Sequence, residues 1–95
     1  MASLPEVSIV RREVPTPFEQ KGLVMRTLVE RADPTTLFLL DGVKIIDDTG
    51  WTLVLPDPES PITHIHAEAK TRAEAEERVD HAARDLEWIL TEGTL

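Results

Sequence analysis

The stretch from Asp41 to Ala69, DGVKIIDDTGWTLVLPDPESPITHIHAEA, decides the fold class. It holds three runs rich in Val, Ile, Thr and Trp, the composition typical of β-strands, and turn-forming residues separate the runs. The tetrad at 47–50, DDTG, predicts a tight hairpin between the first two runs, 43–46 and 51–55. Three prolines within Pro56–Pro61 are incompatible with a hydrogen-bonded strand, so these six residues are predicted to form a loop.

The third run, from Ile62 to Ala69, is predicted to be a strand with two different faces. Successive side chains of a strand point to opposite sides of the sheet. The odd-numbered members are therefore expected in the core: Thr63, Ile65, Ala67 and Ala69. The even-numbered members are expected on the other face: His64, His66 and Glu68.

The segment before this stretch predicts two further strands and a helix. Residues 7–14 and 37–40 are rich in Val, Ile and Leu, and the pair Asp41-Gly42 breaks the second of them from the run at 43–46. Thr16 to Glu19 (TPFE) has the pattern of a capping box with proline at the first helical position, so a helix is predicted from there to about Arg31. The helix is expected to end at 32–34, Ala-Asp-Pro.

Inside this first helix, Val24, Met25 and Leu28 form the predicted apolar stripe. Gly22 costs about 1 kcal/mol relative to alanine in a helix, and we interpret it as a mark of close packing.

The segment after the stretch predicts a second helix. Thr71-Arg72-Ala73-Glu74 is another capping box, and the helix is expected to reach about Thr91, with Gly93 as its stop. Its apolar residues fall on one face: Ala75, Val79, Ala82, Ala83, Leu86, Ile89 and Leu90. The order β-α-β-β-β-α predicts an α+β fold, an antiparallel sheet of about four strands covered by two helices.

Length and composition limit the function. Ninety-five residues suit a single domain, 1–95. The net charge of -8 argues against a nucleic-acid partner. The absence of cysteine excludes disulfides and thiol chemistry. The sequence has no apolar run long enough to predict a membrane span, and its N-terminal residues lack the pattern of a signal peptide. A cytoplasmic location is therefore expected. The excess of arginine over lysine favours a GC-rich bacterial source.

The order of these motifs resembles the C-terminal domain of the α-D-phosphohexomutases, the phosphomannomutase and phosphoglucomutase family. The matching features are the strand pair DGVKI at 41–45, WTLV at 51–54, the proline-rich loop, HAEA at 66–69 and the Ala/Glu-rich last helix. The segment QKGLVMR at 20–26 also resembles the helix that precedes this domain in such enzymes.

In that family the loop has the form Arg-Pro-Ser-Gly/Asn-Thr-Glu-Pro and holds the phosphate of the sugar. The resemblance places these positions, in order, at Leu55, Pro56, Asp57, Pro58, Glu59, Ser60 and Pro61. Leu55 offers no cation in place of the arginine, Asp57 and Glu59 replace two hydroxyl donors by carboxylates, and Pro58 lacks a backbone N–H. The loop is therefore predicted not to grip phosphate.

The resemblance implies a degenerate, non-catalytic domain with a structural or regulatory role, excised from a longer chain. The implied parent is a mannose-1-phosphate guanylyltransferase-like fusion protein, a nucleotidyltransferase that would use Mg²⁺ and contact this domain through its other domains. The domain itself is expected to hold no cofactor and to bind no membrane. The alternative is an active phosphomannomutase or phosphoglucomutase that binds phosphosugar, with Ser60, Lys44 or a backbone amide replacing the lost donors.

Other residues allow further chemistry. His64, His66 and Glu68 lie at i, i+2 and i+4 of one strand and could bind Zn²⁺. Asp57 and Glu59 could form an acid–base pair, although a solvated acidic loop explains them as well.

Three more residues have simple structural interpretations. His81 is expected on the surface and Trp51 in the core. Trp88 lies off the apolar stripe, where it either packs half-buried on its neighbours or docks onto the parent protein.

Overall fold

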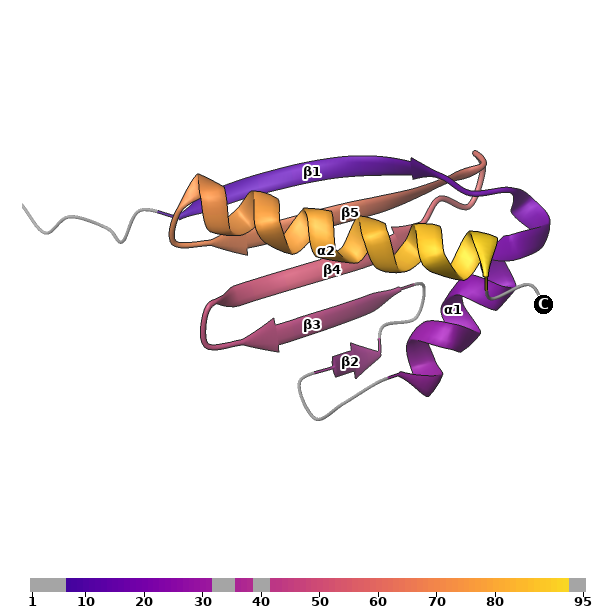
Figure 1. The fold of residues 1–95 in the computed structure, drawn as a ribbon, viewed down its shortest axis with the longest axis horizontal. Coiled ribbons are helices and arrows are strands. Elements are labelled where there is room, and N and C mark those ends of the chain that lie inside the picture. The colour runs from indigo at the N-terminus through magenta and orange to yellow at the C-terminus, as the bar shows by residue number, and fades with distance from the viewer. Residues whose placement is uncertain (1–6, 32–35, 39–41, 93–95) are drawn as a thin grey trace, which may run out of the picture.

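The computed structural model describes residues 7–31, 36–38 and 42–92. Within these ranges the chain forms a 3-10 turn, two helices and strands in the order expected for an α+β domain (Figure 1). The elements are β1 (Ser8–Pro15), η1 (Phe18–Gln20), α1 (Lys21–Glu30), β2 (Thr36–Phe38), β3 (Val43–Asp47), β4 (Gly50–Pro56), β5 (Ile62–Ala69) and α2 (Arg72–Thr91).

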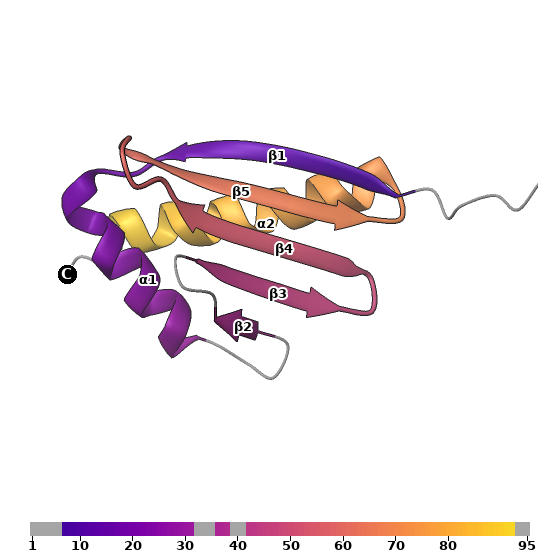
Figure 2. The same ribbon diagram turned by 180° about the vertical axis from the view of Figure 1, so that it is seen from behind.

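The strands form one antiparallel sheet in the order β1-β5-β4-β3-β2 among the described residues (Figure 2). The α+β class, the antiparallel sheet and the β-α-β-β-β-α order are therefore confirmed. The three-residue edge strand β2 overlaps the run predicted at 37–40 and makes the described sheet five-stranded. β1 is the first of the described strands, yet it pairs along its whole length with β5, from Ser8 opposite Ala69 to Pro15 opposite Ile62.

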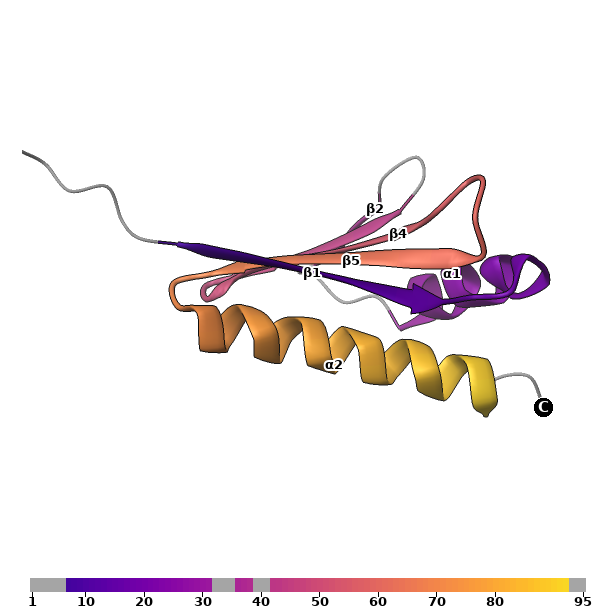
Figure 3. The same cartoon turned by 90° about the horizontal axis from the view of Figure 1, so that it is seen from above.

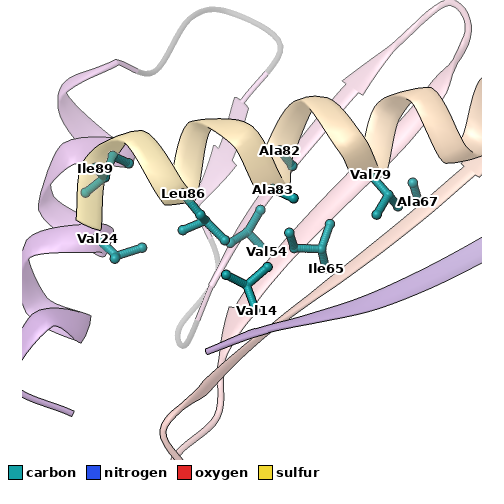
Figure 4. Packing of buried hydrophobic residues seen from close by; sticks show 10 residues of the cluster. All are labelled: Val14, Val24, Val54, Ile65, Ala67, Val79, Ala82, Ala83, Leu86 and Ile89. Carbon is teal, nitrogen blue, oxygen red and sulfur yellow. The ribbon is translucent and has the colours of Figure 1, made fainter. Parts of the chain in front are cut away.

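Helix α2 lies across one face of the sheet, while α1 lies at the end of the sheet beside the last turns of α2 (Figures 1 and 3). The other face of the sheet has no described element over it, and we call it the open face (Figure 3). The core fills the space between α2, α1 and the sheet (Figure 4). Its buried members are Val14, Val24, Val54, Ile65, Ala67, Val79, Ala82, Ala83, Leu86 and Ile89.

The predicted faces of β5 and α2 are confirmed. Thr63, Ile65, Ala67 and Ala69 are buried under α2, whereas the even-numbered residues of β5 are partly exposed on the open face. On α2 the predicted apolar residues from Ala75 to Ile89 are buried. Fully burying each Val, Leu or Ile side chain contributes about 1.5–3 kcal/mol, so this layer supplies the main stabilisation of the fold.

The two predicted capping boxes have different outcomes. At α2 the Thr71 hydroxyl accepts a hydrogen bond from the Glu74 amide at 3.1 Å, so this cap is confirmed. At the first helix the prediction is wrong, because the turn begins after Pro17 without a side-chain cap. Thr16 is instead fully buried, and its hydroxyl contacts that of Thr63 at 2.8 Å.

Gly22 does not mark close packing, because an added Cβ would meet no atom within 4 Å. Gly50 does lie at a close approach, in the hairpin predicted at 47–50. Its φ is +150°, and an added Cβ would lie 1.9 Å from the carbonyl oxygen of Glu68. Only glycine fits this position without displacement of the backbone.

Several predicted boundaries lie outside the described residues: the helix end at 32–34, the strand residues 39–40, Asp41 of the turn pair, and Gly93. In the described part of the chain, neither helix has the combination of length and hydrophobicity that a membrane span requires.

Candidate functional site

The loop that resembles a phosphate-binding loop joins β4 to β5 at the end of the sheet nearest the start of α1 (Figure 1). Its boundaries differ from the prediction by one residue, since Pro56 ends β4 opposite Thr63. Proline is tolerated here because, among the described residues, the pairing of β4 with β3 stops at Val54, so Pro56 lies at a locally unpaired edge of the strand. The loop is braced at its base by hydrogen bonds from the Asp57 amide to the Ile62 carbonyl and from the Thr16 amide to the Pro61 carbonyl, both 2.8 Å.

Asp57 binds the loop's own backbone. One carboxylate oxygen, Oδ1, accepts hydrogen bonds from the amides of Glu59 at 2.8 Å and Ser60 at 2.9 Å. The other, Oδ2, lies 2.8 Å from Nε2 of His64 on β5. The hydrogen bond from His64, followed by those from the two amides, lowers the pKa of Asp57 to about 2. Asp57 is therefore ionised at neutral pH, and its own carboxylate already occupies two of the loop's backbone amides.

Lys21, the first residue of α1, holds the opposite side of the loop. Its ammonium donates to the backbone carbonyls of Asp57 and Ser60, the latter at 2.5 Å. The same ammonium lies 4.4 Å from the ring centroid of Phe18, in cation–π contact. The loop thus directs its carbonyl oxygens toward a cation and two of its amides toward its own carboxylate.

The side chains of Leu55, Pro58 and Glu59 add no donor to the loop. Leu55 lies on the open face beside His64 in the pairing register, and its side chain packs where a Cβ on Gly42 would fall. Pro58 and Glu59 are exposed. Sequence reasoning missed the roles of Lys21 and His64, although the Lys-Gly pair at the helix start was part of the resemblance.

The candidate zinc ligands share the open face but do not converge. The rings of His64 and His66 are 6.4 Å apart between centroids, and Glu68 accepts a hydrogen bond from the Trp51 indole at 3.0 Å. Burial, then the charges of Arg11 and His64, lower the pKa of His66. Within the described ranges no three His, Asp or Glu side chains are grouped closely enough to hold a metal ion.

The prediction that Trp51 belongs to the core is wrong. Trp51 lies on the open face opposite Glu68 and Ile46, because register 51↔68 places it in the row of even-numbered β5 residues. Its ring receives the ammonium of Lys44 at 4.7 Å from the centroid. Lys44 is therefore engaged with Trp51, while the loop lies at the end of β4.

Helix α2 carries the other two singled-out side chains. His81 is exposed, as expected, and lies 3.6 Å from Asp85. Trp88 is 53% exposed, and the guanidinium of Arg31 lies 5.9 Å from its ring centroid. This contact fits packing on its neighbours, and the docking interpretation stays a prediction.

Arg78 forms a cluster that the sequence did not reveal. Its guanidinium binds Asp47 at 3.0 and 3.1 Å and the hydroxyls of Thr49 and Thr52 at 2.7 and 3.0 Å. The hydrogen bonds from Thr49 and Arg78 hold the pKa of Asp47 well below its usual range. Arg78 is mostly buried and ties α2 to the β3–β4 hairpin across a groove of about 740 Å³. We assign it a structural role.

The fold and loop together define an α+β domain of the type that the resemblance implied, and two known proteins show sequence similarity to it. The chain is 34% identical over 82 residues to a probable phosphoglucosamine mutase of Methanopyrus kandleri and 32% identical over 83 residues to one of Pyrococcus furiosus. These matches cover 84% and 83% of this chain but 18% of each relative. No protein-family model matches the chain. The similarities support a phosphohexomutase-type domain.

Proposed function

We propose that this chain is a phosphohexomutase C-terminal-type domain that no longer binds a sugar phosphate and has a structural or regulatory role in a longer protein. One observation carries the proposal: Asp57 occupies the amides of Glu59 and Ser60 that an incoming phosphate would need. Backbone amides in such loops bind anions only when they are free to point at the ligand. Here they donate to a side chain that is ionised at neutral pH.

Charge around the loop supports the same conclusion. A phosphate at these amides would meet the carboxylates of Asp57 and Glu59, and like charges at short range repel. The ammonium of Lys21, which could offset them, is already bound to two carbonyl oxygens. His64 donates toward Asp57 and has Glu13 at 3.8 Å on its other nitrogen.

The parent protein is inferred from similarity alone. Both relatives are named as mutases, and both are archaeal, so they favour a phosphoglucosamine mutase-like parent over the guanylyltransferase-like fusion and give no support to a bacterial source. We propose that Mg²⁺ and the reacting groups belong to other domains of the parent, with which this domain would pack in the cytoplasm. Its partners would be those domains rather than nucleic acid or membrane.

The alternative is a domain that still binds phosphosugar in an active mutase, and the names of the two relatives favour it. It requires Asp57 to leave the amides of Glu59 and Ser60. The titration of the native chain described below tests this alternative. The Asp57→Asn variant tests the cause of the block: if the carboxylate charge alone blocks the loop, the amide side chain will permit weak phosphate binding.

The main experiment is an NMR titration of the ¹⁵N-labelled chain with inorganic phosphate and with glucosamine 6-phosphate, each to about 10 mM. A dissociation constant equal to that concentration corresponds to a binding free energy of only about 3 kcal/mol, so weak binding would be detected. We expect no saturable shift of the amides at 55–62. A quadruple variant that restores the family residues at four of the five changed positions, Leu55→Arg, Asp57→Ser, Pro58→Gly and Glu59→Thr, and leaves Ser60 in place, is expected to gain saturable shifts there. Saturable binding to the unmodified loop would refute the proposal. The single variant Leu55→Arg adds the cation but keeps Asp57 in place. It is the matched control, and we expect it to show no saturable shifts.

A further inference from the structure

The outer edge of β1 is free in the described structure. β1 is the terminal strand of the sheet, and its neighbour in the hydrogen-bonded ladder is β5 (Figures 1 and 2). At eight residues it is as long as β5. Such an edge presents unpaired N–H and C=O groups that can pair with another strand. Apolar side chains near its start, Val7 and Ile9, are 51% and 58% exposed.

The side chains of β1 divide into two sets, one on each face of the sheet. Register with β5 places Arg11 beside His66 and Glu13 beside His64, so Arg11 and Glu13 lie on the open face. Val10 and Val14 lie on the side of α2, where they pack against or within the core. Arg12 lies on that side as well and pairs with Asp80 of α2 at 2.5 Å.

We propose that two copies of this chain associate through β1, antiparallel and about a two-fold axis at Arg12, to make one continuous sheet. A two-fold axis perpendicular to the sheet keeps the helices of both copies on one side, so residues opposite each other must share a face. Centring on Arg12 places Arg11 opposite the partner's Glu13 and Val10 opposite the partner's Val14. Both pairs are of the kind that stabilises antiparallel sheets.

Neighbouring registers are less favourable. Centring on Arg11 places two Arg11 side chains opposite each other on the open face, and centring on Glu13 does the same with two carboxylates. Centring on Arg12 also opposes two like charges, but each Arg12 already has Asp80 beside it to offset the charge. Among the registers centred on Arg11, Arg12 and Glu13, charge complementarity therefore favours the one centred on Arg12.

The surroundings of the edge fit this arrangement. A shallow hollow of about 340 Å³ lies at the β1–β5 edge and is lined by Arg11, Arg12, Glu13, His64 and His66. A second Glu13 would enter beside Arg11 and His66, where partial burial, then the charges of Arg11 and His64, now lower the pKa of His66. In the dimer each of these rows of the open face continues across the axis with one Arg11–Glu13 pair at the junction.

Sedimentation equilibrium of the chain at about 150 mM salt, where the net charge of -8 is screened beyond about 8 Å, tests the association. We expect a concentration-dependent monomer–dimer equilibrium that Glu13→Arg weakens by about tenfold, because it replaces two attractive pairs by repulsive ones. The double variant Arg11→Glu/Glu13→Arg is expected to restore the dimer. Glu87→Arg on the exposed side of α2 is the control for the charge change. A monomer at every concentration, or no rescue by the double variant, overturns the proposal.

Cysteine cross-linking tests the register, since the chain has no native cysteine. In the proposed dimer Arg12→Cys faces its own copy and should form an inter-chain disulfide under mild oxidation. Ile9→Cys would be six residues from its copy along the strand, about 20 Å, and should not. Equal cross-linking of the two variants, or cross-linking of Ile9→Cys alone, refutes the proposed register. Circular dichroism spectra confirm that each variant is folded, so loss of the fold cannot imitate loss of the interface. None of these outcomes depends on the state of the phosphate-type loop.

Discussion

The buried hydroxyl pair of Thr16 and Thr63 allows a quantitative test of how the loop's base is held. Both residues are fully buried, and their Oγ1 atoms are 2.8 Å apart. Because the Thr16 hydroxyl donates its one hydrogen to the Val14 carbonyl at 3.0 Å, Thr63 must be the donor within the pair. The two positions are therefore not equivalent.

Thr16→Val leaves a buried donor on Thr63 without an acceptor and removes the bond to Val14, so we expect a loss of about 1–3 kcal/mol. Thr63→Val removes one hydrogen bond but leaves no buried donor without an acceptor, so we expect a loss of about 1 kcal/mol in the free energy of unfolding. The double variant also removes the Thr63 hydroxyl, the donor that Thr16→Val leaves without an acceptor. It should therefore cost about 1 kcal/mol less than the sum of the two single variants.

Urea denaturation followed by circular dichroism measures these free energies of unfolding, and a constant m-value shows that the compared states are the same. Thr27→Val is the control partner, since its hydroxyl donates to the Leu23 carbonyl within α1. Its effect should add to that of Thr16→Val. If Thr16→Val and Thr63→Val are additive within about 0.3 kcal/mol, the inferred coupling is wrong.

Three other substitutions test the core, the hairpin and the loop. Leu86→Ala, at a site 1% exposed, should lower the free energy of unfolding by about 2–5 kcal/mol in urea melts. Gly50→Ala should cost more than about 1 kcal/mol, because φ is +150° and the added Cβ meets the Glu68 carbonyl; a neutral result would contradict the hairpin geometry. Asp57, whose folded pKa of about 2 is below its ordinary 3.8, contributes stability above pH 4 that is lost as the pH falls toward 2. Asp57→Asn should flatten that part of the acid unfolding curve, and an unchanged curve would argue against the role of this carboxylate.

Most of the fold could be predicted because helix caps and the alternation of strand faces depend on residues that are close together in the sequence. The cap of Thr71 involves the amide three residues ahead, and the alternation along β5 follows from strand geometry. Thr16 carries the same local signal as Thr71, but its hydroxyl bonds Thr63, 47 residues away, and this long-range contact overrides the cap. A sequence pattern alone cannot distinguish the two outcomes.

The candidate site was only half predictable for a related reason. The residue types in the loop indicated that phosphate donors were missing. The replacement contacts depend on where β5 and α1 end relative to the loop, which brings His64 and Lys21 to Asp57. Trp51 was misplaced because its face is fixed by the register with β5, which the sequence of β4 does not specify on its own.

The pairing of β1 with β5 has a consequence for how the chain is made. Ser8 lies opposite Ala69, so a ribosome must add 61 residues after Ser8 before both members of this pair exist. At about 5–20 residues per second this takes about 3–12 s. During that interval the Val- and Ile-rich first strand has no native neighbour, and it is then most open to capture by chaperones or by strands of other nascent chains. Synonymous codons that slow translation between β1 and β5 should therefore lower the soluble yield more than equally slow codons placed in α2.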